Sequence, residues 1–234
     1  MEIVLPLAEL AVVISTLNAA EGLARSLACL AGVCLAEGAV GEVVLADGGS
    51  VDGTIELARA AGVTVVAAPR GRGPQLAAGA AATAAPWLLF LHADTVLRPG
   101  WQSAVRRFMV DPDCRDRAGY FRLALDDPHP AARRIERLAN WRSRRGLPYG
   151  DQGLLIARGL YDRLGGFRPL PLMEDVDLVR RIGRRRLTPL DGVALTSAAR
   201  YRRDGYMLRP LRNLACLVLY FAGVPPRLIR RLYG

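Results

Sequence analysis

The chain has 234 residues, of which 51% are hydrophobic and 23% are charged, and this composition excludes a disordered protein. Its formal net charge of +10 at pH 7 indicates a partner that carries phosphates, such as nucleic acid, anionic lipid or a nucleotide. The basic residues concentrate after residue 100 and are arginines, which suit bidentate contacts with phosphate. A GC-rich genome produces the same arginine bias, so charge alone does not choose among these partners.

The cysteines and the apolar stretches predict where the protein works. The four cysteines, Cys29, Cys34, Cys114 and Cys216, show no C-x-x-C spacing, so a zinc site is not expected. We expect free, mostly buried thiols and therefore a reducing compartment. The sequence predicts no signal peptide, and no apolar stretch reaches the roughly 18 residues that a membrane span needs. The expected location is the cytoplasm, with the inner face of the membrane as a second candidate.

The first 98 residues alternate between apolar runs of strand length and segments with apolar residues at helical spacing. Strands are predicted over 10–14, 42–46, 63–67 and 87–91, and helices over 21–35, 54–61 and 71–84. Such alternation indicates βαβ units and a parallel sheet, which places the chain in the α/β class. The later pattern predicts helices over 101–109 and 131–145, strands over 120–125 and 153–157, a helix starting near 172–177 and a mostly helical 206–233.

The stretch from Trp87 to Thr95 is the clearest prediction of a buried strand with candidate site residues at its end. Its apolar run ends abruptly at His92 and Asp94, as in a strand buried on both faces of a parallel sheet. Ligands of open α/β sheets bind beyond the carboxyl ends of the strands, where these two residues are predicted to lie. Because they are two positions apart, an extended chain points both to one side. The alternative interpretation is that Asp94 only caps a following helix.

Two glycine-rich segments follow earlier strands. Asp47-Gly48-Gly49 permits close backbone approach by a ligand, and its carboxylate can accept hydrogen bonds from a base or from ribose hydroxyls. The alternative is a simple turn in which Asp52 caps the next helix. The segment 70–73, Arg-Gly-Arg-Gly, opens a helix and offers free N–H groups and two arginines to an anion. It is not a Walker A motif, and an ordinary solvated loop is the alternative there.

Three acids stand at the start of a later helix, in Met173-Glu174-Asp175-Val176-Asp177, after the turn Gly165-Gly166-Phe167. Acids at a helix N-terminus can simply complement the helix dipole. Inside an arginine-rich half of the chain, one of them can instead serve as a general base that its surroundings keep charged.

Taken together, these motifs resemble the family 2 glycosyltransferases. The order is Thr16-x-Asn18, Asp47-Gly-Gly-Ser-x-Asp-Gly-Thr54, Gly71-Arg72, His92-Ala-Asp94, Gly165-Gly-Phe and Glu174-Asp175, and the resemblance covers about 10–203. It looks closest to a bacterial subgroup with His-Ala-Asp at the fourth strand. It implies the GT-A fold, with one domain over 1–205 and a C-terminal helical appendage over 206–234. In that domain 10–98 would bind the nucleotide sugar and 99–205 the acceptor.

The resemblance also assigns roles to residues. The donor-binding residues that it implies are Thr16, Asn18, Asp47, Gly48, Arg72, His92, Ala93 and Asp94. Asp47 matches the acid that binds the uracil or ribose, and Asp94 matches the last acid of the D-x-D motif, which holds Mg²⁺ or Mn²⁺ on the diphosphate. Asp175 matches the base that activates the acceptor hydroxyl, with Glu174 as the neighbouring candidate.

The sequence departs from the family pattern in two places. His92 replaces the first acid of the D-x-D motif, so the metal has fewer carboxylate ligands, and His92 either ligates it or orients other groups. Pro74 and Ala77 stand where relatives often have Arg and Asn, which puts the family's diphosphate contacts in doubt.

The function that the resemblance implies is transfer, with inversion, of a sugar from a UDP- or GDP-linked donor to an acceptor hydroxyl. A nucleotidyltransferase is an alternative, but it needs a glycine-rich phosphate loop where the segment 15–18 stands. A basic module that binds nucleic acid or a membrane surface without catalysis is the other alternative. Its arginines are scattered and only 6% of the residues are aromatic, so few platforms for base stacking exist and we expect no nucleic-acid partner.

The segment from Leu214 to Val224 is apolar over about three helical turns and has arginines on both sides. It suits a helix in the membrane interface beside a lipid-linked acceptor, which makes the protein a candidate peripheral membrane protein. A helix packed on the protein core is the alternative.

Overall fold

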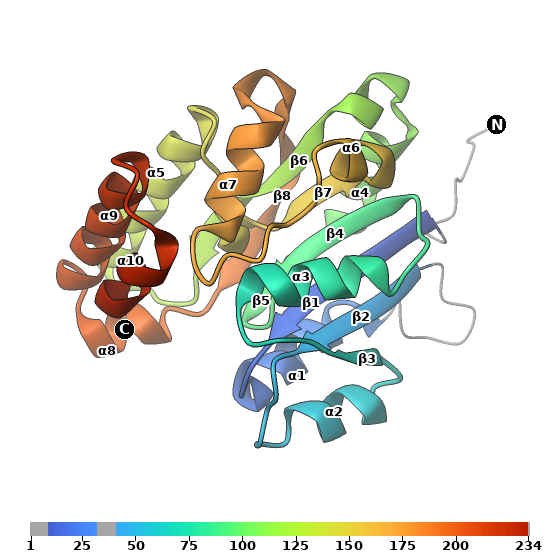
Figure 1. Cartoon of the computed structure of the whole chain (residues 1–234), viewed down its shortest axis with the longest axis horizontal. Helices are drawn as coiled ribbons and strands as arrows, with labels where there is room; N and C mark the ends of the chain where they lie inside the picture. The colour runs from blue at the N-terminus through green and yellow to red at the C-terminus, as the bar shows by residue number, and fades with distance from the viewer. Residues whose placement is uncertain (1–8, 32–40, 234) are drawn as a thin grey trace.

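The computed structural model describes residues 9–31 and 41–233, which form one eight-stranded mixed sheet with helices packed on both faces (Figure 1). The strands are β1 (Leu10–Thr16), β2 (Gly41–Asp47), β3 (Thr64–Ala67), β4 (Trp87–His92), β5 (Thr95–Leu97), β6 (Ala118–Leu125), β7 (Leu154–Ala157) and β8 (Leu187–Thr196). The helices are α1 (Ala20–Ala28), α2 (Thr54–Ala60), α3 (Arg72–Ala81), α4 (Trp101–Val110), α5 (Pro130–Arg144), α6 (Arg158–Arg163), α7 (Glu174–Ile182), α8 (Ala199–Asp204), α9 (Leu208–Phe221) and α10 (Pro226–Tyr233).

The strand order is β3-β2-β1-β4-β7-β6-β8-β5, and the first four of these strands run parallel. From β1 the chain adds β2 and β3 on one side, and it then places β4 on the other side. The crevice beyond the carboxyl ends of β1 and β4 is therefore a topological switch point, where α/β sheets bind their ligands. β5 follows β4 after only two residues but pairs with β8, so the chain leaves the parallel part of the sheet at Asp94.

The predicted elements up to residue 98 are present, with two differences, and β8 is a further difference in the second half of the chain. A short strand follows Asp94, and the next helix begins only at Trp101, so the interpretation of Asp94 as a helix cap is wrong. The helix predicted over 21–35 ends at Ala28, and 32–40 lie outside the described residues. β8 was not predicted, because Pro189 and Gly192 are residue types typical of turns. The structure accommodates them with a register shift against β6.

Alternate residues of the central strands face two separate cores. Val12 and Ile14 of β1 pack toward α1 and α4, in a cluster that also contains Trp101. Val13 faces the opposite cluster, which includes Leu76 of α3 and Leu178 of α7. Burial on both faces explains why the strands of the first half are apolar throughout rather than alternating.

Helix α3 lies unusually close to its neighbours, because two of its positions are glycine. A Cβ on Gly79 would stand 2.4 Å from a Val13 methyl group of β1. A Cβ on Gly73 would stand 2.2 Å from the carbonyl oxygen of Arg168 and 2.8 Å from that of Leu170. The N-terminus of α3 therefore rests directly on the backbone of 168–170, in the second half of the chain.

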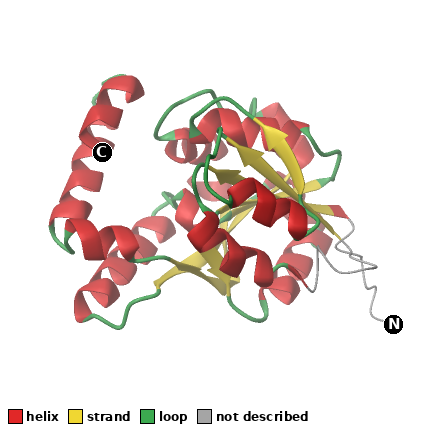
Figure 2. Ribbon diagram, turned by 90° about the horizontal axis from the view of Figure 1, so that it is seen from below, coloured by secondary structure: helices red, strands yellow, loops and turns green. Residues whose placement is uncertain are grey.

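The two C-terminal helices, α9 and α10, lie together at one end of the molecule, beside the sheet (Figures 1 and 2). Their inner sides bury Cys216, Leu217 and Ile229 against Leu172 and Met173, just before α7. This is the packing that the sequence left open, and it joins the C-terminus to the start of α7. Among the described residues, no helix has both the length and the apolar character needed to cross a bilayer.

Three of the four cysteines lie in the described part of the chain. Cys29, Cys114 and Cys216 are free thiols, as predicted, and Cys34 lies outside the described residues. Burial raises the pKa of all three described thiols, so they stay protonated at neutral pH and are poor nucleophiles.

The close approach of α3 gives a direct test of the packing. Gly73→Ala should lower the free energy of unfolding by about 1–3 kcal/mol, because the new methyl group would overlap backbone atoms that cannot rotate away. Gly53→Ala is the matched control, since a Cβ there meets no atom within 4 Å, and it should change stability by less than about 0.5 kcal/mol. Urea denaturation of both variants measures the difference. Equal stability of the two would show that α3 is not held against 168–170.

Candidate active site

A cleft of about 860 Å³ lies at the switch point, and six of the predicted donor-binding residues line it. These are Thr16, Asn18, Arg72, His92, Ala93 and Asp94. Thr16 ends β1 and His92 ends β4, which lies beside it, so the parallel pairing brings the two strand ends to one edge. The other two predicted donor-binding residues, Asp47 and Gly48, are buried and do not line the cleft. Glu174 and Asp175 line a small adjoining cavity.

The loops after β1 and β2 are hydrogen-bonded to each other along their length. Thr16 Oγ1 donates to Asp47 at 3.1 Å, and Asn18 Oδ1 accepts from the backbone N–H of Val51 at 2.9 Å. The backbone N–H of Asn18 in turn donates to Ser50 Oγ at 2.8 Å. Asn18 adopts a φ of +50°, which a non-glycine residue rarely holds without such constraints. The two loops therefore form one rigid wall of the cleft.

The carboxylate of Asp47 holds this wall together. One oxygen accepts from the backbone N–H groups of Gly49 and Ser50, both at 2.8 Å, and the other accepts from the hydroxyls of Thr16 and Ser50. Burial alone would raise the pKa of Asp47, but these hydrogen bonds outweigh it and lower the pKa below the usual value. All four acceptor positions of a carboxylate are thereby used inside the protein.

Gln75 of α3 braces the same wall, although nothing in its local sequence marks it as a residue of the site. Its side-chain amide donates to the carbonyl oxygens of Thr16 and Ala46, at the ends of β1 and β2. A Cβ on Gly48 would stand 3.0 Å from this amide, which explains why glycine follows Asp47. Gln75 is 3% exposed, so it is a buried polar residue whose donors are satisfied by the strand ends.

The turn that carries Asp94 is fixed by its backbone. Ser26 of α1 donates to the carbonyl oxygen of Ala93 at 2.7 Å, and the N–H of Ser197 donates to the carbonyl oxygen of Asp94 at 3.2 Å. A Cβ on Gly22 would stand 3.3 Å from both Cα and Cβ of Asp94, so α1 packs closely on the turn. The carboxylate of Asp94 lines the cleft from a backbone that is held on both sides.

His92 lies between the cleft and the cavity of Asp175. It lines both spaces, and a Cβ on Gly150 would stand 2.6 Å from its Nε2 and 3.5 Å from Oδ2 of Asp175. Asp175 accepts from the N–H of Gly150 at 2.8 Å. Burial, together with the positive charges of Arg72 and Arg200, lowers the pKa of His92 well below its usual value, so the imidazole is neutral at pH 7. The cavity beside Asp175 holds only about 20 Å³, room for about one water.

Glu174 is the most unusual side chain of the site. It is 1% exposed, neither carboxylate oxygen has a hydrogen-bond partner within 9–31 and 41–233, and Arg72 lies 4.0 Å away. Burial and the neighbouring carboxylate of Asp175 raise the pKa of Glu174 well above its usual range, and Arg72 offsets only part of this. By contrast Asp177, the third acid of α7, forms ion pairs with Arg168 at 3.1 Å and Arg181 at 2.6 Å.

Asp151 is a further acid of the site that the sequence did not reveal, because it appeared only as part of a loop. Burial, together with the negative charges of Asp175 and Asp94, raises its pKa to about 6, and the positive charge of Arg142 offsets part of the increase. Its Oδ1 has no hydrogen-bond partner in the described part of the chain. Within the described residues no three His, Cys, Asp or Glu side chains are already grouped at metal-binding distance.

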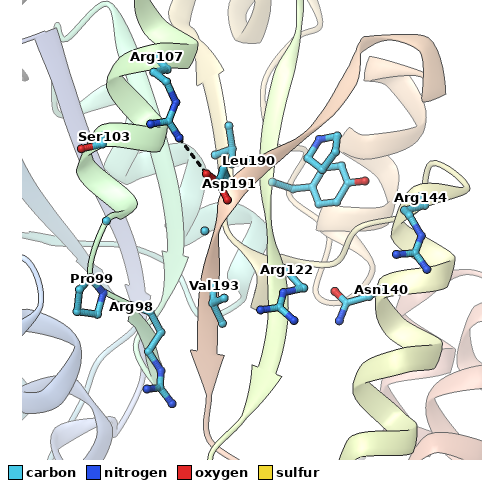
Figure 3. Close-up of a pocket in the computed structure, with 14 residues that line it drawn as sticks. Arg98, Pro99, Ser103, Arg107, Arg122, Asn140, Arg144, Leu190, Asp191 and Val193 are labelled. Atoms are coloured by element: carbon cyan, nitrogen blue, oxygen red, sulfur yellow. Dashed lines mark hydrogen bonds and ion pairs between the residues drawn. The ribbon is translucent and has the colours of Figure 1, made fainter.

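A second cleft of about 620 Å³ lies elsewhere on the protein, and Figure 3 shows the arginines around it. Arg98, Arg122 and Arg144 line it with Arg107, which pairs with Asp191 at 3.2 Å across the bulged part of β8. None of the predicted site residues lines this cleft, so the chemistry suggested by the sequence gathers at the switch point alone.

The family model described as "Glycosyl transferase family 2" matches residues 11–167, more than half of the chain. The chain belongs to glycosyl transferase family 2. It is thus a glycosyltransferase. The two alternatives considered from the sequence, a nucleotidyltransferase and a binding module without catalysis, are therefore rejected. The matched region runs from β1 to the Gly165-Gly166-Phe167 turn and includes the cleft wall, the Asp94 turn and Asp151. No curated protein matches the chain in sequence.

Solved structures of glycosyltransferases share the fold of this family 2 member. S. aureus TarS 1-349 superposes with a TM-score of 0.65 at 14% identity, over 96% of this chain and 69% of TarS. The mannosyltransferase PcManGT from Pyrobaculum calidifontis, in complex with GDP-Man and Mn²⁺, gives 0.65 at 18% identity, over 94% and 66%. Glucosyl-3-phosphoglycerate synthase from Mycobacterium tuberculosis, in complex with Mn²⁺ and UDP, gives 0.55 at 19% identity, over 80% and 70%. These likenesses confirm the GT-A fold that the sequence predicted.

The buried carboxylate of Glu174 predicts a pH-dependent stability for this glycosyltransferase. A pKa raised by folding means that the folded protein loses stability as the pH rises above the ordinary glutamate value of about 4.3. Glu174→Gln removes the charge and should stabilise the protein at pH 8 by on the order of 1–3 kcal/mol, with little effect at pH 4.

Urea denaturation at the two pH values measures this effect. Asp177→Asn is the matched control on the same helix, and it should destabilise the protein at pH 8 because it breaks the ion pairs with Arg168 and Arg181. A Glu174→Gln protein no more stable than the wild type at pH 8 would contradict the raised pKa of Glu174.

Proposed function

We propose that the protein transfers a sugar, with inversion, from a nucleoside-diphosphate sugar to an acceptor hydroxyl, using a divalent cation at Asp94. The observation that carries this proposal is the switch-point cleft, where the Asp94 carboxylate, the N-terminus of α3 and the joined loops after β1 and β2 face one space. The proposal keeps 10–98 as the donor-binding half and 99–205 as the acceptor-binding half, with 206–234 as an appendage.

The nucleoside would lie against the wall formed by the two joined loops, where Thr16 and Asn18 line the cleft. Asp47 would act by shaping this wall, because a direct contact with the base or ribose requires Thr16 or Ser50 to give up its hydrogen bond to the carboxylate. The first turn of α3 offers free N–H groups, the positive end of the helix dipole and Arg72 to the diphosphate. The base, whether uracil or guanine, stays open in this proposal.

Mg²⁺ or Mn²⁺ fits the residues around Asp94. Mg²⁺ sites commonly use one or two carboxylates together with the phosphate oxygens of the substrate, and Asp94 lines the cleft where the diphosphate would lie. A neutral imidazole can bind Mn²⁺ as a ligand. Because the pKa of His92 is low, its imidazole is neutral, and His92 is the second candidate ligand. When bound, the cation would neutralise the charge that develops on the leaving diphosphate.

Asp175 is the general base in this proposal, with Glu174 as the alternative. The carboxylate of Asp175 accepts two backbone hydrogen bonds, from Gly150 at 2.8 Å and from Val176 at 2.7 Å, which hold it in one orientation. His92 stands between it and the cleft, so the acceptor hydroxyl would have to enter beside His92 and Gly150. Glu174 carries a raised pKa and lacks such positioning bonds. Asp175 therefore takes the proton as the hydroxyl attacks the anomeric carbon.

The role of Asp94 is tested by nucleotide binding. Calorimetry with UDP and with GDP should show affinity that depends on Mn²⁺ and is lost in Asp94→Asn, because the amide cannot replace a charged ligand of the cation. Glu21→Gln is a matched control among the residues that line the same cleft and should keep metal-dependent binding. Equal nucleotide affinity in chelator and in Mn²⁺ would contradict the metal assignment.

The role of Asp175 is tested by the transfer rate. Asp175→Asn keeps the size and acceptor oxygen of the side chain but cannot take a proton, so transfer should fall roughly 10²–10⁴-fold while nucleotide affinity stays nearly unchanged. Glu174→Gln and Asp177→Asn should cost less. If Glu174→Gln loses transfer and Asp175→Asn keeps it, the base is Glu174. Full activity in all three variants would remove α7 from the mechanism.

We also propose that the protein binds a membrane surface through the outer side of α9 and α10. An apolar face, defined by Leu208, Leu211, Leu214, Val218 and Phe221 on α9 and by Leu228 and Leu232 on α10, is exposed. The side chains on α9 recur every three or four residues and are each 47–58% exposed, so they form one stripe along the helix. The opposite side of the same helices packs on the protein.

The charges around this apolar face favour an anionic bilayer as its occupant. Arg227, Arg230 and Arg231 are exposed on α10. A helix pair with an apolar stripe and adjacent arginines has the character of an interfacial membrane anchor. Such an anchor would bring the cleft, which Arg230 and Tyr233 of α10 also line, to acceptors in the membrane.

Vesicle flotation tests the membrane proposal. The wild type should bind vesicles that contain phosphatidylglycerol and should bind pure phosphatidylcholine much more weakly. Leu211→Ser, Leu214→Ser and Val218→Ser together should abolish binding, because they replace the exposed stripe without touching the packed side. Val110→Ser, on α4, is the control for an exposed apolar residue outside the face. Unchanged binding by the triple variant would contradict the proposal.

Truncation before Arg209 is a poorer test, since it would expose the residues buried next to α7.

A further inference from the structure

More arginines than carboxylates line the switch-point cleft. Eight arginines line it: Arg25, Arg70, Arg72, Arg200, Arg202, Arg203, Arg209 and Arg230. The carboxylates that line it are three: Glu21, Asp94 and Asp126. In the proposed function Asp94 is committed to the cation, so the excess of positive charge faces the substrates.

Most of these arginines already have partners within the protein. Arg25 and Arg202 pair with Asp126, Arg203 and Arg209 pair with Asp204, and Arg72 faces Glu174. Arg70 donates to the carbonyl oxygen of Gly48 at 3.3 Å, on the nucleotide side of the cleft. Among the described residues, Arg200 and Arg230 alone of the eight have no hydrogen-bond acceptor or carboxylate partner for their guanidinium groups.

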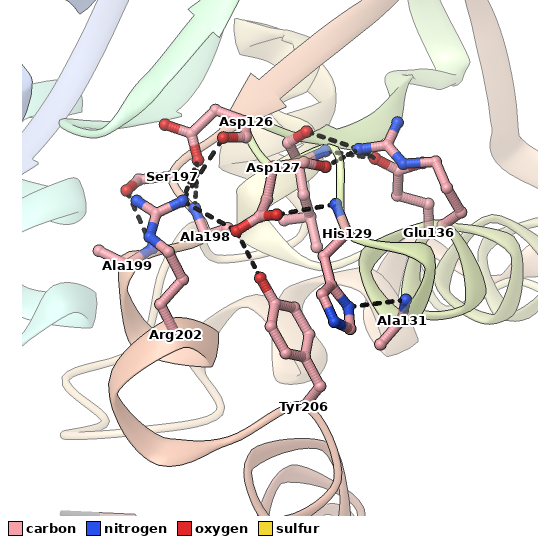
Figure 4. A network of polar contacts seen from close by, with 12 residues as sticks. Asp126, Asp127, His129, Ala131, Glu136, Ser197, Ala198, Ala199, Arg202 and Tyr206 are labelled. Carbon is pink, nitrogen blue, oxygen red and sulfur yellow. Dashed lines mark hydrogen bonds and ion pairs between the residues drawn. The ribbon is translucent and has the colours of Figure 1, made fainter.

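Arg200 is held close to the proposed reaction centre by the segment before it. It lies in the first turn of α8, three residues after Ser197, whose N–H binds the carbonyl oxygen of Asp94. A polar network anchors α8, as Figure 4 shows: Asp126 accepts from the N–H of Ala198 at 2.6 Å, and Arg202 donates to Asp127 at 3.2 Å. The helix is therefore fixed to the Asp94 turn, and the Arg200 side chain lines the cleft.

Asp127 is the centre of that network. Hydrogen bonds from the Tyr206 hydroxyl at 2.6 Å and from the backbone N–H of His129 lower its pKa to about 2, so it stays charged at any pH of interest. The rings of His129 and Tyr206 stack with centroids 4.9 Å apart. The position of α8 thus does not depend on Arg200, and the side chain can be changed without loosening the helix.

Arg230 reaches the same cleft from α10, which is anchored by Arg209. The buried guanidinium of Arg209 donates to the carbonyl oxygen of Tyr233 at 3.2 Å and lies 4.3 Å from the centre of its ring. Arg230 and Tyr233 both line the cleft. Arg200 and Arg230 are therefore two guanidinium groups, from separate anchored helices, that face one space and have no partner among the residues that the structure describes.

We propose that Arg200 and Arg230 bind a phosphate group on the acceptor, an inference that rests on the proposed function. The donor diphosphate has its own positive partners in the Asp94 cation, Arg70 and the start of α3, so a second anion best accounts for the surplus charge. Two guanidinium forks match the several oxygens of a phosphate monoester, and these charge-assisted bonds are stronger than neutral ones. The acceptor class is a hydroxyl compound that carries a phosphate.

Two kinds of molecule have this chemistry: a phosphate on a lipid and a phosphate on a small soluble molecule. The place of Arg230 favours the lipid, since α10 carries Arg230 into the cleft and exposes Leu228 and Leu232 elsewhere on its surface. A phosphate held at Arg230 would then lie on the same helix as the apolar face. The test separates the two sources.

Calorimetry with simple probes tests the proposal on the full chain saturated with Mn²⁺ and UDP or GDP, so that the donor site is occupied. Decyl phosphate, below the concentration at which it forms micelles, is the lipid-like probe, and sn-glycerol 3-phosphate is the soluble one. Arg200→Gln and Arg230→Gln should each weaken decyl phosphate binding by about 10-fold or more, as expected for loss of a charged hydrogen-bond donor. Neither variant should change nucleotide affinity. Arg122→Gln, in the other arginine-lined cleft, is the matched control and should bind like the wild type (Figure 3).

The outcomes separate this inference from the proposed function. Stronger binding of decyl phosphate than of glycerol 3-phosphate supports a lipid acceptor, and equal, arginine-dependent binding of both supports a soluble phosphate. Equal binding of decyl phosphate, decanoate and the neutral decyl glucoside would overturn the phosphate site, as would a double variant that binds decyl phosphate like the wild type. Failure of UDP and GDP to bind would count against the donor site instead. The probes are also measured on the nucleotide-free protein, where the arginine dependence must remain.

Discussion

The carboxylate of Asp47 is the constraint on which the cleft depends. Four hydrogen bonds converge on it, and they join the end of β1 to the loop after β2. With Gln75 bound across the same two strand ends, the strained φ of Asn18 is held in place and the loops present one rigid face. A pre-formed wall of this kind lets a ligand bind without ordering the protein first, so little binding energy is lost to conformational entropy.

Much of the first half of the fold was predictable because the sheet is buried on both sides there. Runs such as Trp87–Leu91 are apolar throughout, and the polar residues that end them mark the edge where ligands bind. The second half was harder to predict for a physical reason. β8 holds Pro189 and Gly192 at a register shift, and α6 and α8 have only six residues each, too few to show a helical period.

The site was only partly predictable in the same sense. His92 and Asp94 follow a strand, and Glu174 and Asp175 start a helix, so each carries a local signal in the sequence. Gln75 looks like any residue of an alanine-rich helix, and its role appears only once α3 is packed across β1 and β2. Arg200 has no ion-pair partner among the described residues because the nearby carboxylates pair with other arginines. These pairs form only in the folded protein, so no local sequence pattern predicts them.

In the proposed function, the switch-point cleft binds a nucleoside diphosphate through a cation at Asp94. Crystals grown with Mn²⁺ and UDP or GDP test this most directly, by the anomalous signal of manganese. We expect a single strong peak at bonding distance from the Asp94 carboxylate, with the nucleoside against the Thr16–Asn18 wall. A manganese peak away from Asp94, or a nucleotide bound in the arginine-lined cleft of Figure 3, would contradict it.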